Sequence, residues 1–229
     1  EPKDIIHNAI GYQRLLLSGM GGNKKINIKK LKEAQNPIHF AISLTGETLA
    51  YPKLNELIKE IRNRGATSFI VTNGQLPDVL GNIEPPTQLY LTVAAPTKEL
   101  YKEVCRPENR DYWERLNKSL DILKKLKKEK KIRTAIRLTL VKGYNMVKPE
   151  EYAKLIEKAE PDFLETKAYM FVGASRQRLS LKNMPRHNEI VDFAKEISKY
   201  SSYKIIDEQT ASRVVLLMQE DKKERVIRL

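Results

Sequence analysis

The sequence predicts an α/β fold with a parallel β-sheet that is curved or closed as a barrel. Short apolar segments of strand length alternate with longer amphipathic segments along nearly the whole chain. This alternation is typical of parallel strands joined by helical crossovers. Turn residues such as Gly, Asn and Pro separate the segments. At 229 residues the chain is long enough to bury a substantial core, as one large domain or two small ones.

The chain is expected to begin with a helix over residues 2–20, where isoleucines and leucines recur near helical spacing and Gly21-Gly22 follow. A basic connector over residues 23–32 then leads to the first strand. This strand is predicted over residues 38–44 because the run is apolar, and it ends abruptly at Gly46.

The second helix is predicted over residues 53–63, where leucines and isoleucines form one apolar stripe and Gly65 follows the end. A short buried-type strand over residues 68–71 comes next, and the turn Thr72-Asn73-Gly74 closes it. A third strand is expected over residues 88–93.

The second half of the chain repeats the alternation. A long helix over residues 111–128 is followed by a strand over 134–141 and by a helix over 149–157 that begins with proline. A fifth strand over residues 163–167 and a helix over 188–200 follow. Two closing strands are predicted, over 204–206 and 214–217.

Polar residues gather in the loops that follow the predicted strands. In parallel sheets and barrels, these loops carry the chemistry. They are Gly46-Glu47, Thr72-Asn73, and residues 92–97, 142–145 and 167–175. Gly46 allows a close backbone approach to a ligand, and Glu47 can receive an ammonium group. The alternative is a turn glycine beside a solvated glutamate, since every such loop is polar to some degree.

Basic residues exceed acidic ones, with 42 Lys and Arg against 29 Asp and Glu, so the formal net charge is +13. This excess indicates a polyanionic partner, with nucleic acid favoured over a membrane surface. A generally charged surface of the thermophile kind also explains it, because 31% of residues are charged. The densest basic run, residues 124–131, is either a binding surface or a solvated helix end.

The chain has one cysteine, Cys105, which excludes an intrachain disulfide or a cysteine cluster within it. A single thiol fits a reducing, cytoplasmic location, and we expect it to be buried in a helix. No run is apolar enough to cross a bilayer, so no membrane association is expected. Because Glu1 is not an initiator methionine, we expect further residues upstream.

Six segments carry a family resemblance. In chain order they are ISLTGETLAYP, FIVTNGQLPDVL, EPPTQLYLTVAAPTKE, RTAIRLTLVKGYNM, PDFLETKAYMFVGAS and MPRHNEI. They resemble tRNA 4-demethylwyosine synthases, which are radical S-adenosylmethionine enzymes of wyosine biosynthesis. RLTLVKGYN and TNGQLP are the specific ones. The charge pattern is similar to that of the archaeal branch, which lacks a fused flavodoxin domain.

The resemblance implies a single partial (β/α) barrel domain of the radical S-adenosylmethionine type over residues 1–229, without its cluster-binding front. It implies S-adenosylmethionine and a 4Fe–4S cluster held by an upstream Cys-x3-Cys-x2-Cys loop, with a second cluster also bound upstream. The implied reaction, of the carbon–carbon lyase class, condenses N1-methylguanosine in tRNA-Phe with two carbons of pyruvate. The product is 4-demethylwyosine. An electron donor and a monomeric state are also implied.

By resemblance, Gly46 and Glu47 hold the amino group of S-adenosylmethionine. Thr72 and Asn73 follow the next strand and are expected to bond its ribose or carboxylate, although Thr-Asn-Gly is also good turn material. Arg137 is expected to pair with a carboxylate of the cofactor or of pyruvate. Two departures from the family pattern stand out. Thr48 replaces a proline, which loosens the turn, and Ala94 stands where the family often has Asp.

Two lysines are candidates for direct contact with pyruvate. Lys142 follows the apolar run LTLV, where a desolvated amine would be nucleophilic and could form a Schiff base. It could instead hold the pyruvate carboxylate or a tRNA phosphate as a cation, or be a surface lysine. Lys167 is the second candidate, with the same alternatives.

The remaining candidates are assigned to tRNA. Asn145 is expected to read the guanine edge or to cap the following helix. Ser175, Arg176 and Arg178 lie in a loop suited to backbone phosphates. His187 is either a further binding residue or a structural histidine at a helix start.

Two other functions remain open. The chain could be a non-catalytic tRNA-binding barrel domain that has lost the cluster, or a cluster-free lyase that uses a Schiff-base lysine. The sequence upstream distinguishes the radical enzyme from both, because only the radical enzyme needs the cysteine loop.

Overall fold

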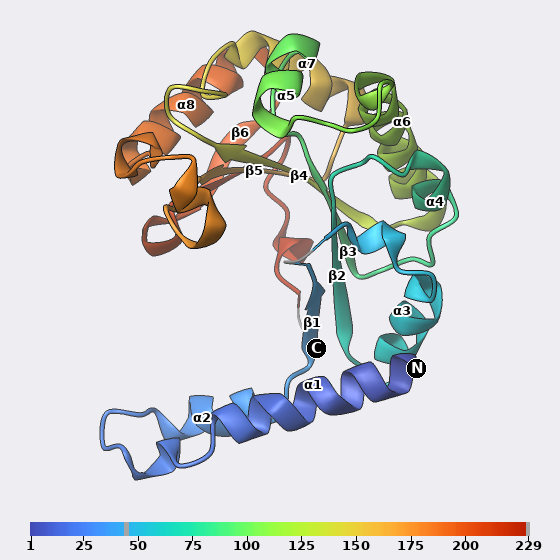
Figure 1. Ribbon diagram of the computed structural model, residues 1–229, viewed down its shortest axis with the longest axis vertical. Coiled ribbons are helices and arrows are strands. Elements are labelled where there is room, and N and C mark those ends of the chain that lie inside the picture. Colours follow the sequence, from blue (N-terminus) through green and yellow to red (C-terminus); the bar gives the residue numbers. More distant parts are fainter. Residues whose placement is uncertain (44–45, 228–229) are drawn as a thin grey trace.

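One curved β-sheet organises the molecule. We describe it from a computed structural model, in which residues 1–43 and 46–227 are described. Seven strands pair in the order β1-β2-β3-β4-β5-β7-β6 (Figure 1). They are β1 (His39–Ile42), β2 (Thr67–Thr72), β3 (Gln88–Thr92), β4 (Arg133–Leu140), β5 (Phe163–Ala168), β6 (Lys204–Gln209) and β7 (Val214–Met218).

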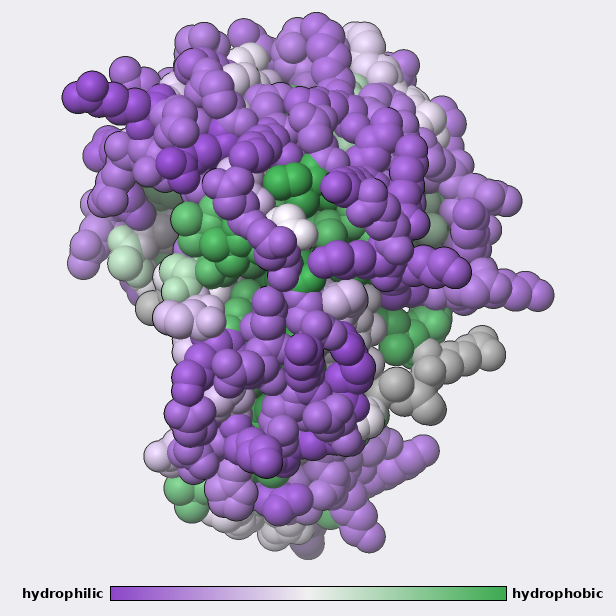
Figure 2. All heavy atoms as spheres, turned by 90° about the vertical axis from the view of Figure 1, so that its right-hand side faces the viewer, coloured by the Kyte–Doolittle hydropathy of each residue, from purple (hydrophilic) through white to green (hydrophobic). Residues whose placement is uncertain are grey.

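Helices cover the convex face of this sheet (Figure 1). They are α3 (Leu54–Asn63), α4 (Pro77–Gly81), α5 (Lys98–Cys105), α6 (Tyr112–Lys130), α7 (Pro149–Ala159) and α8 (His187–Tyr200). Two further helices, α1 (Pro2–Leu16) and α2 (Ile28–Ala34), lie below β1 (Figure 1). Figure 2 shows the face over α3, α4 and α6 as largely hydrophilic, with apolar residues in patches near its middle. In the described part of the chain, no helix is both long and apolar enough to span a bilayer.

The predicted alternation of strands and helices is confirmed. Strands β1 to β5 pair in parallel in sequence order, as the alternation predicts. Strand β7 is the exception, because it runs antiparallel to both β5 and β6. Only residues 210–213, which include the short turn Thr210–Ser212, separate β6 from β7. A connection this short can reverse the chain but cannot return it for a parallel pairing.

The main core lies between the sheet and its helices. Alternate residues of the strands point outward into it, among them Leu89, Leu91, Ile136 and Leu138, all fully buried. The other face of the sheet is concave and carries a much smaller apolar cluster around Ala135 and Phe163. The remainder of the concave face is therefore available for polar side chains.

The sheet does not close. Strands β1 and β6 lie at its two edges, and they do not pair with each other in the part of the chain that the structure describes. The fold is thus a partial barrel, as expected. Its concave face is open on one side, and the carboxyl ends of β1 to β5 lie along one edge.

Several boundaries differ from prediction. Helix α1 ends at Leu16 and a separate short turn covers Met20–Gly22. The basic connector contains α2, which the sequence pattern did not reveal because it is short and mostly polar. Helices α4 and α5 were also missed, and they too are short.

Cys105 is exposed at the end of α5, so the prediction of a buried thiol is wrong. Residue Leu44, the predicted end of the first strand, lies outside the described residues.

Candidate functional site

The candidate site is the mouth, by which we mean the residues at the carboxyl ends of β1 to β5. Glu47 follows β1, Asn73 follows β2, and Ala94 lies just beyond β3. Lys142 follows β4, and Lys167 is the next-to-last residue of β5. Parallel strands bring all five positions to one edge of the sheet, which is where open α/β folds bind ligands.

The Glu47 carboxylate joins the ends of β1 and β2. Its Oε1 accepts hydrogen bonds from the Thr72 hydroxyl at 2.6 Å and from the Leu49 amide at 3.1 Å. Its Oε2 accepts one from the Asn73 amide at 2.9 Å. Two carboxylate oxygens offer about four acceptor positions. The three donors therefore orient the carboxylate and leave room for a further donor such as an ammonium group.

The turn after β2 depends on Gly74. Its φ is +74°, and a Cβ there would lie 2.7 Å from Leu91 Cδ1 and 3.2 Å from Ser119 Cβ. Its amide donates to the Thr72 hydroxyl at 3.0 Å, and its carbonyl accepts from the Ser119 hydroxyl at 2.7 Å. This turn aims the Asn73 amide at Glu47. The Thr-Asn-Gly run therefore acts both as a turn and as part of the mouth.

The turn after β1 is tied down by Thr48. Thr48 is almost fully buried, and its hydroxyl donates a hydrogen bond to the Ile42 carbonyl at 3.1 Å. The expectation that Thr48 loosens the turn is therefore wrong, since its hydrogen bond replaces the restraint that a proline ring would supply. Gly46 has φ +77° with open space where a Cβ would be, so its requirement is conformational.

Arg137 points onto the concave face, where it pairs with Glu165. Its Nε and Nη2 lie 2.9 Å and 2.8 Å from Glu165 Oε2. The guanidinium also lies over the Tyr90 ring, 4.3 Å from its centroid. Burial and the Glu165 charge raise the pKa of Tyr90 to about 12. Because Glu165 already occupies one edge of the guanidinium, a ligand carboxylate would meet only the remaining donors of Arg137.

Lys142 lies away from the concave face. Its side chain is 54% exposed and pairs with Glu189 at the start of α8. The expectation that a strand end desolvates this amine is therefore wrong. The Arg186 amide and the Lys142 ammonium hold the pKa of Glu189 below its ordinary value. Lys142 thus resembles a charge-pairing lysine more than a nucleophile.

Lys167, unlike Lys142, lies on the concave face of the sheet. It lies two residues beyond Glu165 on β5, so both side chains project from the concave face. The residue is half-buried. Among the described residues, no carboxylate lies within ion-pairing distance of its ammonium group. Of the two predicted lysines, Lys167 is therefore the one that faces the barrel interior.

Asn145 braces the mouth from within. Asn145 is 1% exposed, and its side-chain nitrogen Nδ2 donates to the carbonyls of Ala94 and Thr139 at 2.7 Å and 2.8 Å. Its side-chain oxygen accepts from the Val141 amide at 2.6 Å. These contacts leave no exposed group to read a guanine edge. Nor does Asn145 cap α7, whose N-cap is Lys148.

The loop after β5 presents two of the predicted tRNA contacts. Arg176 and Arg178 are exposed, whereas Ser175 turns inward. The Ser175 hydroxyl donates to the Val172 carbonyl at 2.6 Å and lies 2.7 Å from the Tyr169 hydroxyl. The two arginines can reach a phosphate, but the Ser175 hydroxyl is engaged within its own loop.

His187 begins α8 and faces β6. Its side chain is 16% exposed, and Nε2 lies 3.3 Å from Glu208 Oε2. Both ring nitrogens are buried, and neither has a hydrogen-bond partner among the described residues. The burial fits a structural histidine better than an RNA contact.

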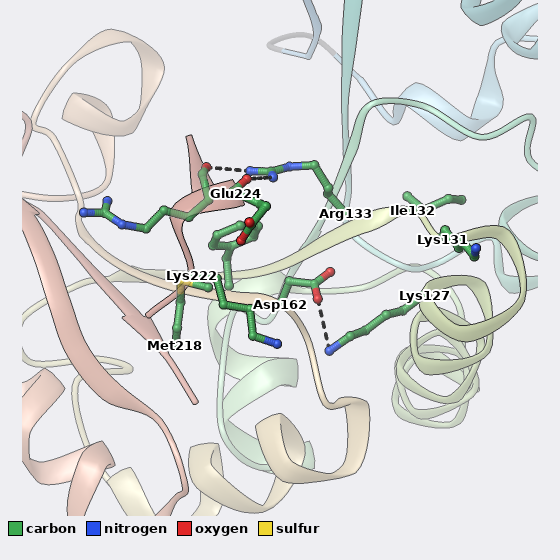
Figure 3. A pocket seen from close by; sticks show the side chains of 10 residues that line it. Lys127, Lys131, Ile132, Arg133, Asp162, Met218, Lys222 and Glu224 are labelled. Atoms are coloured by element: carbon green, nitrogen blue, oxygen red, sulfur yellow. Dashed lines mark hydrogen bonds and ion pairs between the residues drawn. The ribbon is translucent and has the colours of Figure 1, made fainter. Parts of the chain in front are cut away.

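One hollow lies beside the mouth and another at the opposite end of the barrel. One of about 750 Å³ lies beside Lys142 and is lined by Lys182, Arg186 and Arg213. The other, of about 290 Å³, lies at the amino ends of β4 and β5, opposite the mouth (Figure 3). There Arg133 donates to the carbonyls of Glu224 and Arg225, and the C-terminal segment covers this end of the barrel.

The described residues can hold an amino acid group but not an iron–sulfur cluster. No group of three or more His, Cys, Asp or Glu side chains among them has metal-binding geometry. Their one cysteine, Cys105, lies at the end of α5. By contrast, the oriented carboxylate of Glu47 suits the amino group of S-adenosylmethionine.

Sequence reasoning missed Glu165, Tyr90 and Glu189 as members or neighbours of the site. A signal was present for Glu165, because the segment FLETK alternates and places Glu165 and Lys167 on one face of a strand. Tyr90 follows the same rule on β3. The pairing of Glu189 with Lys142 joins residues 47 positions apart, which no local pattern predicts.

Comparisons with known proteins identify the family. Residues 26–156 match the model of the radical SAM superfamily, and residues 158–219 match that of wyosine base formation. An S-adenosyl-L-methionine-dependent tRNA 4-demethylwyosine synthase of Pyrococcus horikoshii is 48% identical over 96% of this chain and 65% of its own length. Its counterpart in Methanocaldococcus jannaschii is 42% identical over 97% of this chain and 70% of its own length.

Solved structures of the same family superpose closely on this chain. A structure of TYW1 with a lysine–pyruvate adduct bound superposes with a TM-score of 0.84, at 39% identity, over 97% of this chain and 70% of that one. A crystal structure of archaeal TYW1 gives a TM-score of 0.80 at 38% identity, over 97% and 72% of the two chains. This chain spans about 65% of the length of the Pyrococcus relative. It belongs to the radical SAM superfamily and, within it, to the family of tRNA 4-demethylwyosine synthases.

Proposed function

We propose that this barrel forms part of a radical S-adenosylmethionine enzyme that modifies tRNA. The reaction condenses N1-methylguanosine in tRNA-Phe with pyruvate to give 4-demethylwyosine, and it is of the carbon–carbon lyase class. Membership of the synthase family supports this proposal.

The observation that carries the proposal is the carboxylate of Glu47, held by Thr72 and Asn73 at the strand ends. We assign the amino group of S-adenosylmethionine to Glu47. Gly46 leaves open space for a ligand beside it. When bound, S-adenosylmethionine supplies a radical by reductive cleavage, which requires an electron donor and a 4Fe–4S cluster. We assign no cluster ligand to these residues, since they supply only one cysteine.

We assign pyruvate to Lys167 rather than to Lys142. A relative with a lysine–pyruvate adduct supports covalent capture of pyruvate by a lysine in this family. The Lys167 amine would attack the keto carbon of pyruvate, and loss of water would give the imine. Its place beside Glu165 on the concave face favours it. Arg137, on the neighbouring strand, is the candidate partner for the pyruvate carboxylate, through the donors that Glu165 leaves.

We assign tRNA phosphates to Arg176 and Arg178, which are exposed on the loop after β5. The net charge of +13 supports a polyanionic substrate. We further propose that the enzyme acts as a monomer in the cytoplasm, where its substrate tRNA is found.

The test uses the full-length protein, reconstituted with iron and sulfide under anaerobic conditions. We expect about four irons for each cluster formed. Incubation with tRNA-Phe carrying N1-methylguanosine, a reductant, S-adenosylmethionine and pyruvate should give the tricyclic base, and omission of any one should abolish it. A cluster-free protein that still binds tRNA would instead be a binding domain. A cluster-free protein that traps pyruvate and turns it over would be a Schiff-base lyase.

A further inference from the structure

A second basic surface lies apart from the mouth. We name it the basic arm and define it as residues 23–34, which include α2. Together with the end of α1, it projects from the body below β1 (Figure 1). Its five lysines are all exposed, and they are Lys24, Lys25, Lys29, Lys30 and Lys32. Its only acidic residue is Glu33.

The arm differs from the other basic run of the chain in how its charges are paired. Lys124 and Lys128 lie 2.6 Å and 3.8 Å from the Glu160 carboxylate, and Lys125 lies 3.9 Å from Glu129. No arm lysine has a described carboxylate within 4.0 Å. The run on α6 is thus partly neutralised within the protein. The arm retains a concentrated positive charge that an external anion can satisfy.

The arm is held in a defined position. The Arg14 guanidinium of α1 donates to the Gln35 carbonyl at 2.9 Å and to the Asn36 side chain at 3.0 Å. The Asn27 side chain accepts from the Lys30 amide at 3.1 Å and so caps α2. The Arg14 contacts tie the C-terminal end of α2 to α1, and the Asn27 cap stabilises its first turn, so its lysines form a prearranged surface. A fixed surface loses less entropy on binding than a disordered tail.

The position of the arm separates it from the reacting base. Strand β1 begins at His39, close after the arm, and its carboxyl end leads to Glu47 at the mouth. The length of β1 therefore lies between the arm and the mouth. An RNA that delivers one nucleotide to the mouth extends well beyond that nucleotide. Its backbone is the polyanion that the arm fits best.

We propose that the basic arm binds phosphates of the tRNA substrate away from the nucleotide that is modified. This proposal rests on tRNA being the substrate. Arg176 and Arg178 would contact the RNA near the mouth, and the arm would contact it at a second place. The arm would contribute to affinity without taking part in the chemistry, because phosphate contacts position a nucleic acid and carry no base information.

The test compares two triple variants of the full-length, cluster-loaded protein. The arm variant carries Lys29→Gln, Lys30→Gln and Lys32→Gln. The control carries Lys124→Gln, Lys125→Gln and Lys128→Gln, which removes the same charge from lysines that are paired within the protein. We expect the salt dependence of tRNA binding, as a log–log slope, to decrease by about 2–3 in the arm variant only.

We also expect the arm variant to lose at least about tenfold in tRNA affinity near about 0.1 M salt, with kcat at saturating tRNA unchanged. Thermal melting of the arm variant should match the wild type, because its three lysines make no ion pair with a residue that the structure describes. A wild-type slope in the arm variant would overturn the proposal, and so would equal losses in both variants.

Exposed Leu15, Leu16 and Ile28 near the lysines make a membrane surface the competing partner. If the arm variant lost binding to anionic phospholipid vesicles but not to tRNA, the arm would be a membrane contact and the proposal would be wrong. If the wild-type protein failed to bind tRNA at all, the proposed function would fail instead. The two failures are thus distinguishable.

Discussion

At the scale of single residues, Glu47 is the centre of the candidate cofactor site. Its carboxylate is oriented by one hydroxyl and two backbone amides, all within 3.1 Å. These donors belong to the end of β2 and to the turns after β1 and β2, so the orientation follows from the sheet itself. A carboxylate that is fixed before binding loses little conformational entropy when it binds an ammonium group.

Replacing Glu47 with Gln should therefore lower the affinity for S-adenosylmethionine by at least about tenfold. The change keeps the size of the side chain but removes the charge, and a hydrogen bond to a charged group contributes about 1.5–3 kcal/mol. Isothermal titration calorimetry on the cluster-loaded, full-length protein measures this. Glu103→Gln, on the exposed side of α5, is the matched control and should leave affinity unchanged. Equal affinities for wild type and Glu47→Gln would remove Glu47 from the cofactor site.

The two lysines give opposite predictions for pyruvate capture. Borohydride reduction in the presence of pyruvate, followed by peptide mass spectrometry, should find the adduct at Lys167. Lys167→Arg should abolish the adduct and the product, because arginine keeps the charge but forms no imine. Lys142→Arg should retain both, because it preserves the ion pair with Glu189. An adduct at Lys142, or at a lysine outside this chain, would show that Lys167 is the wrong residue.

The limits of sequence reasoning are clear at this scale. Glu47, Thr72 and Asn73 were predicted as neighbours, because parallel strand ends must meet at one edge. Asn145 was misread, because its burial depends on three backbone groups from two different strand ends. Such non-local contacts leave no local pattern in a sequence.

At the scale of elements, the turns after the strands set the geometry of the mouth. Gly74→Ala should destabilise the protein by about 2–5 kcal/mol, since the left-handed conformation costs alanine about 1–2 kcal/mol and crowding against Leu91 and Ser119 adds about 1–3 kcal/mol. Gly65→Ala is the control, with φ +69° and open space around its Cβ, and it should cost only the conformational part. Urea unfolding measures both. Equal losses would show that the crowding at Gly74 is relieved without cost.

The start of α8 should make stability depend on pH. The pKa of Glu189 is held below its ordinary value of 4.5 by the Arg186 amide and by Lys142. A lowered pKa stabilises the fold above the unfolded value, and this stabilisation is lost as pH falls through the folded value. Glu189→Gln should thus be less stable than the wild type near about pH 6, and the two unfolding free energies should converge towards about pH 3. A constant difference across this range would contradict the assignment.

Long and strongly periodic elements could be predicted from the sequence, whereas short ones could not. The stripe of α3 and the apolar strands β2 to β5 reflect burial against the main core, which repeats at a fixed period. Helices α2, α4 and α5 have at most eight residues, which is too few to show a period. The antiparallel direction of β7 is set by the length of its turn, not by its apolar pattern.

At the scale of the whole molecule, the open barrel separates stability from function. The core between sheet and helices holds the fold together, and the concave face and mouth present polar groups. Positive charge is also unevenly distributed over the surface. It is partly neutralised on α6, where Glu160 and Glu129 lie close, and it remains concentrated on the basic arm and on the loop after β5.

The central claim is that the mouth joins pyruvate carbons to a base of tRNA. The most direct test supplies carbon-13-labelled pyruvate, S-adenosylmethionine and N1-methylguanosine-containing tRNA-Phe to the anaerobic, cluster-loaded, full-length protein. Nucleoside mass spectrometry then follows the label. We predict that two labelled carbons enter a tricyclic base, and that Glu47→Gln reduces the amount formed while Glu103→Gln does not. A tRNA that gains no labelled carbon from a protein with an intact cluster would contradict the account.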